Sequence, residues 1–318
     1  MTSDVSVAAA ALVRRRIASN IDGVLLLDKP VGPSSNQVLQ QARRLFDAKK
    51  AGHSGTLDPF ASGLLPISFG EATKFCGFFL DADKVYETTL SLGVRTSTGD
   101  ITGEVVERRP VRVCDEEVET VVRSFLGKSR QIPPMYSAIK RDGVPLYKLA
   151  RRGEIVAREP RAIQISRLQV LRCAEGEIDL RIQCSKGTYI RVLGEDIGNA
   201  LGCGASLKCL RRIEVAAFDV SASHTLDDLA RLDPEQRCAL LLPPDAGLSY
   251  MPMTVCGAAL VAKLRLGQSV TYSGPEFESA PQVRIYQSEN HEFIGLGRVA
   301  DGNLHPARLI VPASAKIA

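Results

Sequence analysis

Hydrophobic and polar residues alternate along this chain with two periods, one typical of strands and one typical of helices. A nearly continuous apolar run within residues 21–30 ends at Pro30 and predicts a short buried strand. In residues 33–46 the apolar positions recur at helical spacing, behind serines that can cap a helix. Residues 84–93 alternate, which predicts a strand with one buried face.

The same two periods predict further elements before residue 246. Apolar stripes at helical spacing predict helices at 71–80, 116–125 and 188–201. Strict alternation at 178–184 predicts a half-buried strand, and a further strand is predicted at 207–220.

A domain boundary is expected at residues 246–252, because a pair of prolines closes the preceding region and the pattern then changes. A short helix is predicted at 258–266, and the dipeptide Asp301-Gly302 predicts a hairpin turn. A small unit this rich in turns is typical of a barrel-like binding module. Its strands are predicted at 268–272, 282–287, 293–299 and 309–311.

Length and composition describe an ordinary globular chain. Its 318 residues suggest about two domains, and 45% of them are hydrophobic. The net charge of +4 creates no overall basic field, so any nucleic-acid interface must come from local patches. Eight scattered cysteines without a Cys-x-x-Cys pair, and only four histidines, argue against a zinc site and a disulfide scaffold. They fit reduced thiols in a cytosol.

Residues 1–20 are predicted to form a mobile tail. Their apolar run precedes Arg14, Arg15 and Arg16, whereas a secretory signal places its positive charges first. The run is also too short to cross a membrane. The arginines can contact phosphate or simply remain solvated.

Residues 127–161 are polar and basic, and Tyr136 and Tyr147 are interleaved with their cations. Cations bind phosphate and aromatic rings stack on bases, so this composition indicates a flap that contacts RNA. A solvated surface insertion explains the same composition equally well.

Residues 52–66 place one carboxylate, Asp58, in a loop rich in glycine and proline, close to His53 and two hydroxyls. Pro59 biases Asp58 towards an extended backbone, so the loop presents its carboxylate instead of placing it in a helix. An ordinary turn has similar residues, and composition alone does not separate the two interpretations.

Four residues far apart in the sequence can meet only through the fold: Asp58, Tyr86, Tyr189 and Arg191. An arginine beside a carboxylate would hold it ionised and oriented. Each also has an ordinary structural explanation, as a core aromatic or as a surface cation.

An ordered series of motifs covering nearly the whole chain resembles the bacterial tRNA pseudouridine-55 synthase (TruB) family. These motifs include the Asp58 loop and the segment Cys184–Arg191. The resemblance implies an α/β (α+β) fold, with the mixed, largely antiparallel central sheet of the pseudouridine synthase fold and a small β-barrel-like C-terminal PUA domain. The other matching segments are Leu26–Pro30 with Gly32, Ser34 and Ser35, then 83–86, 136–140, 210–212 and 293–309.

By this resemblance, Asp58 would be the catalytic aspartate that opens the glycosidic bond, and Arg191 would pair with it. Tyr86 would stack on the extruded base as part of the catalytic set. Tyr189 would contact the base and is a candidate for handling the C5 proton. The substrate-binding set implied in this way is His53, Tyr86, Tyr189 and Leu210.

The implied reaction breaks the N1–C1′ bond of a flipped uridine and rejoins the base through C5. It needs no cofactor and no metal, because nothing is oxidised or supplied from outside. Asp58 can attack C1′ or remove the C2′ proton, and both routes remain open. The expected partner is the T arm of tRNA, with uridine 55 as the target. We expect a cytoplasmic monomer that does not bind membranes.

The resemblance divides the chain into a tail (1–20), a catalytic domain (21–248) with an RNA-binding insertion (127–161), and a PUA domain (252–318). One alternative is a tRNA-binding or tRNA-folding protein in which catalysis is secondary. Another is a hydrolase that uses Asp58 on a nucleoside or sugar, although no motif supplies the second carboxylate that glycosidases use.

Overall fold

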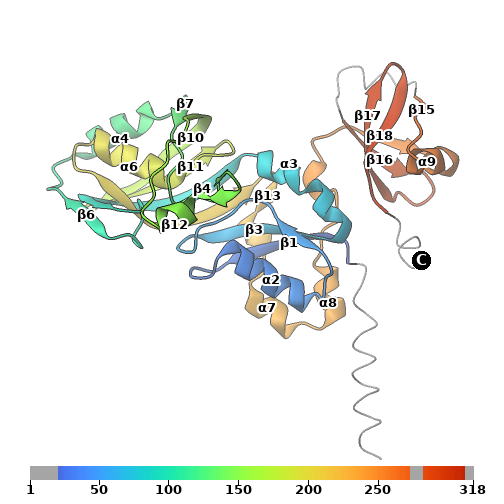
Figure 1. The fold of residues 1–318 in the computed structure, drawn as a ribbon, viewed down its shortest axis with the longest axis horizontal. Helices are drawn as coiled ribbons and strands as arrows, with labels where there is room; N and C mark the ends of the chain where they lie inside the picture. Colours follow the sequence, from blue (N-terminus) through green and yellow to red (C-terminus); the bar gives the residue numbers. More distant parts are fainter. Residues whose placement is uncertain (1–20, 273–281, 312–318) are drawn as a thin grey trace, which may run out of the picture.

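The structure is a computed structural model that describes residues 21–272 and 282–311. The tail predicted at residues 1–20 therefore lies outside the described residues. In the described part, a large α/β region carries the long central sheet, and a smaller β-rich unit follows it (Figure 1).

The central sheet has nine strands in the part of the chain that the structure describes. Its neighbours pair antiparallel, apart from the parallel pair β3–β12, so the predicted mixed, largely antiparallel sheet is confirmed. In spatial order the strands are β1 (Gly23–Lys29), β3 (Ser62–Phe69), β12 (Ala205–Val215), β4 (Lys84–Leu92), β11 (Glu177–Cys184), β10 (Arg161–Ala174) and β7 (Gly127–Gln131), with β2 (Ala51–His53) beside β3 and β13 (Phe218–Asp219) beside β12.

Two helix groups cover the two halves of this sheet (Figure 1). Helices α4 (Asp115–Ser124) and α6 (Ile190–Ala200) pack on β10 and β12 around the larger core. Helices α2 (Ser35–Leu45) and α7 (Leu226–Arg231) pack together over a second core beside β1. Ser34 caps α2 with a capping box, as its sequence predicts.

Shorter elements connect these layers. The helix predicted at 71–80 consists of a 3₁₀ helix, η1, followed directly by a short α-helix, α3. The remaining elements are η1 (Gly70–Phe75), α3 (Cys76–Asp81), β5 (Val94–Thr96), β6 (Val105–Arg108), β8 (Lys140–Arg141), β9 (Val144–Pro145), α5 (Leu146–Ala150), η2 (Val220–Ala222), α8 (Pro234–Ala239) and η3 (Ala246–Leu248).

The parallel pair β3–β12 fixes the end of the Asp58 loop. Gly63 lies opposite Arg212 in this pair and has a φ of +103°. A Cβ on Gly63 would lie 2.2 Å from the carbonyl oxygen of Arg212, so no other residue fits without moving the strands apart. The glycine at position 63 is therefore a packing requirement.

The C-terminal unit has its own sheet and core. The predicted hairpin turn at Asp301 and Gly302 is confirmed, since both residues have positive φ and join β17 to β18. The strand predicted at 309–311 is wrong, because β18 begins at 303 and ends at 309. The elements are β14 (Met253–Cys256), β16 (Val283–Gln287), β17 (Phe293–Ala300), β18 (Asn303–Leu309), β15 (Val270–Thr271) and α9 (Ala258–Arg265).

The C-terminal unit is docked on η1 and α3 through apolar and polar contacts. The rings of Phe75 and Phe293 lie 5.4 Å apart in a shared cluster. Lys74 Nζ donates a hydrogen bond to the carbonyl oxygen of Leu309 at 2.7 Å, and Arg308 Nη1 donates to that of Lys74 at 2.6 Å. The two regions are therefore connected by more than their linker.

Candidate active site

Buried polar groups hold the loop that carries Asp58. The ammonium group of Lys29 is fully buried at the end of β1 and donates a hydrogen bond to the carbonyl oxygen of Ala61 at 2.6 Å. Ser35 Oγ accepts a hydrogen bond from the Leu57 amide at 2.8 Å and donates one to the Leu57 carbonyl oxygen at 2.9 Å. The residues before and after Asp58 are thus tied to β1 and α2.

Arg191, near the start of α6, connects this loop to two other segments. Its Nε donates a hydrogen bond to Asp58 Oδ2 at 2.9 Å. Its Nη1 and Nη2 donate to the carbonyl oxygens of Thr98 at 2.8 Å and Tyr136 at 2.6 Å. The Arg191 side chain is only 4% exposed, whereas that of Asp58 is 37% exposed. The arginine is therefore a fixed buried partner, and the carboxylate can still be reached from outside.

The electrostatic environment of Asp58 combines opposing influences. Burial raises the pKa of the Asp58 carboxyl above its ordinary value, and the charge of Asp100 raises it further. The Arg191 guanidinium, through charge and hydrogen bond, lowers this pKa and partly offsets burial. Asp100 Oδ2 also lies 3.7 Å from Arg191 Nε, so two carboxylates share one arginine. A carboxylate in such a site is more basic than one in water.

Both candidate tyrosines lie within range of the Asp58 charge, because that charge raises the pKa of each phenol. Tyr86 is on β4, half-buried against the larger core, and burial is the main cause of its raised pKa. Tyr189 is the N-cap residue of α6, and burial likewise raises its pKa. Both phenols therefore stay neutral, and each offers an apolar ring and a polar hydroxyl.

A glutamine on β7 fixes the backbone of Tyr189. Gln131 is 5% exposed, and its Oε1 accepts a hydrogen bond from the Tyr189 amide at 2.8 Å. Its Nε2 donates to the Tyr189 carbonyl oxygen at 3.1 Å. The side-chain amide thus satisfies both polar groups of the Tyr189 backbone. The Gln131 amide was not expected from the sequence, where Gln131 is only one polar residue among the many of the insertion.

The remaining two expected site residues are His53 and Leu210. His53 ends β2, and burial and the charge of Arg212 lower the pKa of its imidazole, so it is neutral. His53 Nδ1 is buried without a hydrogen-bond partner among the described residues. Leu210, on β12, is buried in the core against which Tyr86 packs. The structure thus pairs Asp58 directly with Arg191 and places Tyr86 and Tyr189 within range of the Asp58 charge.

Two buried cations, Arg212 and Lys29, also hold this region, and neither was assigned a role from the sequence. Arg212 is 1% exposed, and donates hydrogen bonds to the carbonyl oxygens of Leu64 at 2.8 Å and Gly55 at 3.2 Å. Burial lowers the pKa of Lys29 to about 8, while Asp58 acts in the opposite direction. In the sequence, each of these two cations lies within an apolar strand, a pattern that indicates a buried partner.

In residues 21–272 and 282–311, no group of three or more histidine, cysteine or acidic side chains is arranged to hold a metal ion. No helix among the same residues is long and apolar enough to cross a membrane.

Sequence comparisons identify the family. Residues 43–190 match the family described as "TruB family pseudouridylate synthase (N terminal domain)". Residues 191–249 match "tRNA pseudouridylate synthase B C-terminal domain", and residues 257–310 match "Pseudouridine synthase II TruB, C-terminal".

Curated proteins named tRNA pseudouridine synthase B align along most of the chain. The protein from Stutzerimonas stutzeri (strain A1501) is 49% identical over 93% of this chain and 98% of its own length. The one from Burkholderia mallei (strain NCTC 10247) is 49% identical over 92% of this chain and 97% of its own length.

Solved structures agree with this relationship. A chain in the structure entitled "Crystal Structure of a Cbf5-Nop10-Gar1 Complex" superposes with a TM-score of 0.71 and 25% identity, covering 92% of this chain and 86% of that chain. The chain belongs to the TruB family of pseudouridylate synthases.

Proposed function

We propose that this chain is a tRNA pseudouridine synthase that isomerises uridine 55 of the T arm to pseudouridine. The relatives named tRNA pseudouridine synthase B support the substrate class. The observation that carries the proposal is the Asp58 carboxylate, which is paired with a buried arginine and reachable from outside, and whose charge acts on two neutral tyrosines.

In the proposed reaction Asp58 initiates cleavage of the N1–C1′ bond of the flipped uridine. The base then turns, the C5–C1′ bond forms, and the proton released from C5 is replaced by a proton on N1, so the overall composition is unchanged. Attack on C1′ and removal of the C2′ proton both require Asp58 in its ionised form. The charge of Arg191 favours that form against the effect of burial.

The proposed roles of the other residues follow from their surroundings. Tyr86 presents a half-buried ring on which the base can stack. Tyr189 contacts the base and handles the C5 proton from its fixed place before α6. Neutral His53 lies beside the flipped nucleotide, and Leu210 supplies part of the apolar wall.

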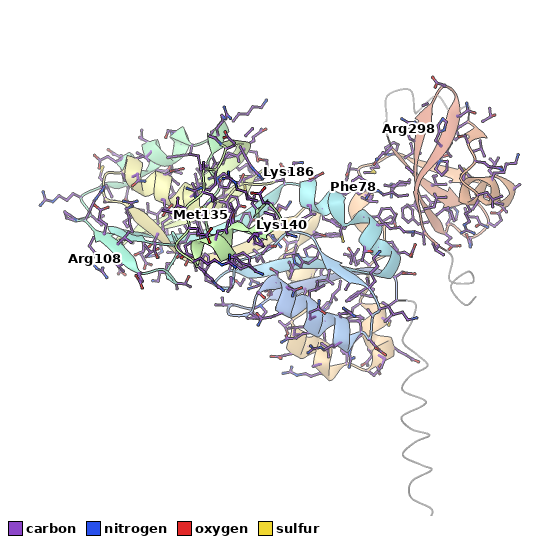
Figure 2. The ribbon with its side chains drawn as sticks, in the orientation of Figure 1. Phe78, Arg108, Met135, Lys140, Lys186 and Arg298 are labelled. Atoms are coloured by element: carbon purple, nitrogen blue, oxygen red, sulfur yellow. The ribbon has the colours of Figure 1, made fainter. Side chains whose placement is uncertain are left out.

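We propose residues 21–248 as the catalytic domain, 127–161 as its RNA-binding insertion, and 252–318 as a PUA RNA-binding domain. The start of β14 at Met253 and the separate C-terminal core support this division. Exposed cations support contacts with phosphate, among them Lys140 on the insertion and Arg298 on the C-terminal unit (Figure 2).

We also propose a monomer that acts in the cytoplasm and uses no cofactor or metal. All eight cysteines are free thiols, which fits a reducing compartment. The reaction exchanges one bond for another within the substrate, so it requires no external reactant.

The direct test is to incubate unmodified tRNA with the protein and map pseudouridine along the product by chemical modification and primer extension. We expect one new pseudouridine, at position 55. Conversion at another position would correct the target, and no pseudouridine at any position would contradict the proposed function. Release of free uracil would instead support a hydrolase.

A tRNA-binding or tRNA-folding protein remains the second candidate, because a basic insertion and a docked C-terminal unit are useful for binding alone. The two are separated by comparing tRNA folding with wild-type protein and Asp58→Ala. If the variant refolds tRNA as well as wild type, binding has its own function. If folding assistance is lost together with turnover, the second candidate is excluded.

Gln131 offers a test of how Tyr189 is positioned. We expect Gln131→Ala to lower kcat by roughly tenfold to 100-fold, because small displacements of a positioned group have effects of that size. KM for tRNA should stay close to wild type, since Gln131 is buried and does not face RNA.

Gln131→Glu should be equally slow, because a carboxylate cannot donate to the Tyr189 carbonyl oxygen. Gln169→Ala, on the exposed side of the neighbouring strand β10, is the matched control. Single-turnover rates separate an effect on kcat from an effect on KM. An unchanged rate for Gln131→Ala, or a change in KM alone, would contradict this role.

A further inference from the structure

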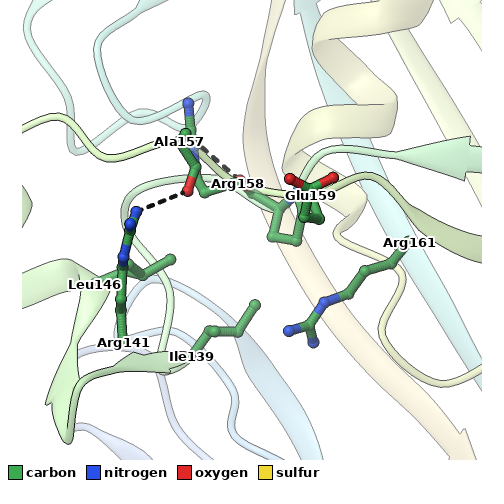
Figure 3. Close-up of a pocket in the computed structure, with 8 residues that line it drawn as sticks. Ile139, Arg141, Leu146, Ala157, Arg158, Glu159 and Arg161 are labelled. Carbon is green, nitrogen blue, oxygen red and sulfur yellow. Dashed lines mark hydrogen bonds between the residues drawn. The ribbon is translucent and has the colours of Figure 1, made fainter.

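A small cavity of about 180 Å³ lies within the proposed insertion, residues 127–161. Three arginines line it, Arg141, Arg158 and Arg161, together with one carboxylate, Glu159 (Figure 3). The remaining wall is largely apolar and includes Ile139. Three cations against one anion give the cavity an excess of positive charge, which attracts an anionic group.

The cavity is adjacent to the candidate active site. Arg161 is the first residue of β10, and its cross-strand partner on β7 is Gln131. Gln131 in turn holds the backbone of Tyr189 through two hydrogen bonds. The charge of Arg161 also reaches Tyr189, because it lowers the pKa of that phenol. A group bound in the cavity would therefore lie close to a nucleotide in the active site.

The three arginines differ in how much of their hydrogen-bonding capacity is already used. Arg141 Nη1 donates to the carbonyl oxygen of Ala157 at 3.2 Å, and Arg158 Nη1 donates to that of Pro133 at 3.1 Å. Arg158 Nε is buried and has no partner among the described residues. The side chain of Arg161 has no hydrogen bond or ion pair within residues 21–272 and 282–311, and its guanidinium points into the cavity (Figure 3).

These features select the chemistry of the occupant. A volume of about 180 Å³ is too small for a typical drug-sized ligand, so a single small group is the natural occupant. Guanidinium groups bind phosphate oxygens through paired hydrogen bonds, and an unused guanidinium is free to do so. The apolar wall near Ile139 suits the sugar attached to that phosphate.

We propose that this cavity binds one phosphodiester group of the RNA strand next to the flipped uridine, with Arg161 as its main ligand. The inference deepens the proposed function and rests on it, since it assumes an RNA strand in the active site. It assigns to the cavity the task of fixing the backbone beside the target base. Phosphate contacts of this kind set register and orientation without reading sequence.

The first test measures the dissociation constant of a tRNA at several salt concentrations, with Asp58→Asn as background to keep the substrate unconverted. Adding Arg161→Ala should weaken binding by about tenfold, the effect of losing a charge-assisted hydrogen bond. The slope of log affinity against log salt should become shallower by roughly 0.7 to 0.9, the contribution of one phosphate. Wild-type affinity and slope for Arg161→Ala would overturn the proposal.

Two further variants sharpen this measurement. Arg172→Ala, at the other end of β10, is the matched control, and we expect it to keep the parental slope. Glu159→Gln removes the one negative charge of the cavity and should tighten binding by up to about fivefold. Weaker binding or no change for Glu159→Gln would argue against a phosphate in the cavity. This variant also decides the question if Arg161→Ala fails to fold.

The bound phosphate can then be located with a stem–loop RNA in which single phosphodiesters around the target uridine are replaced by neutral methylphosphonates. One replacement should weaken binding with Arg161 present and have no further effect in Arg161→Ala. Additive effects at every position would overturn the proposal. Pseudouridine formation by wild-type protein is followed in parallel. Its absence would refute the proposed function, whereas its presence with additive effects would refute the cavity assignment alone.

Discussion

Asp58→Asn protein is expected to form no measurable pseudouridine while still binding tRNA. The amide is nearly isosteric and can still accept a hydrogen bond from Arg191, so the loop keeps its shape. It cannot act as a nucleophile or a base, and we expect single-turnover rates to fall by roughly 10⁴-fold or more. Binding should be retained or slightly tighter, because one negative charge near the RNA backbone has been removed.

The matched control is Asp47→Asn, which makes the same chemical change at an exposed turn. Its rate and affinity should equal those of wild type. Filter binding and pseudouridine mapping on the same tRNA separate binding from turnover. Full turnover by Asp58→Asn would contradict the assignment of Asp58, and lost binding with normal folding would indicate a structural role for the carboxylate.

The pattern of apolar residues predicted most elements of the fold but missed β3, a strand in the middle of the sheet. Pro66 argues against a central strand, because it cannot donate a hydrogen bond to a neighbour. In the structure, β12 pairs with β3 only at Ser62 and Gly63, and β2 pairs with it from Ile67 onwards. Pro66 falls between these two partners, an arrangement that local sequence does not reveal.

Strand β10 was missed for a different reason. Its pairing with β11 shifts register between Ile165 and Arg167 and again between Val170 and Arg172. Each irregularity interrupts the alternation of buried and exposed side chains, so the period of two is lost over its fourteen residues. The regular partner β11 keeps strict alternation and was predicted correctly.

In the candidate site, too, some contacts were expected from the sequence and others were not. The meeting of Asp58 with Arg191, 133 positions apart, was expected from the family resemblance, and the structure has this ion pair. The Gln131 amide and the buried Arg212 guanidinium were not expected. Both bind backbone carbonyl oxygens, which every residue has, so no residue type marks the partner in the sequence.

Arg191→Gln is expected to produce the second large loss of activity, with a distinctive dependence on pH. The substitution removes the buried positive charge that lowers the pKa of Asp58, while the effects of burial and of Asp100 remain. The pKa of Asp58 must therefore rise further. Because the ionised carboxylate is the active form, a smaller fraction is active at any given pH below that pKa.

Single-turnover rates measured from acid to neutral pH should therefore show the acidic limb of the profile displaced to higher pH in Arg191→Gln. Raising the pH should recover part of the activity. A remaining loss of roughly 100-fold is expected at all pH values, because the carbonyl oxygens of Thr98 and Tyr136 lose charged donors and the loops that hold Asp58 shift.

Arg181→Gln is the matched control, since Arg181 also pairs with a carboxylate, Glu87, but is 49% exposed. It should keep the wild-type profile, because exposed ion pairs contribute little. Thermal unfolding of both variants tests whether Arg191→Gln remains folded, and Arg191→Lys restores the charge if it does not. A uniform loss with an unshifted acidic limb would mean that Arg191 positions the loops without setting the charge of Asp58. A displaced limb would assign to Arg191 the electrostatic control of the proposed catalytic carboxylate.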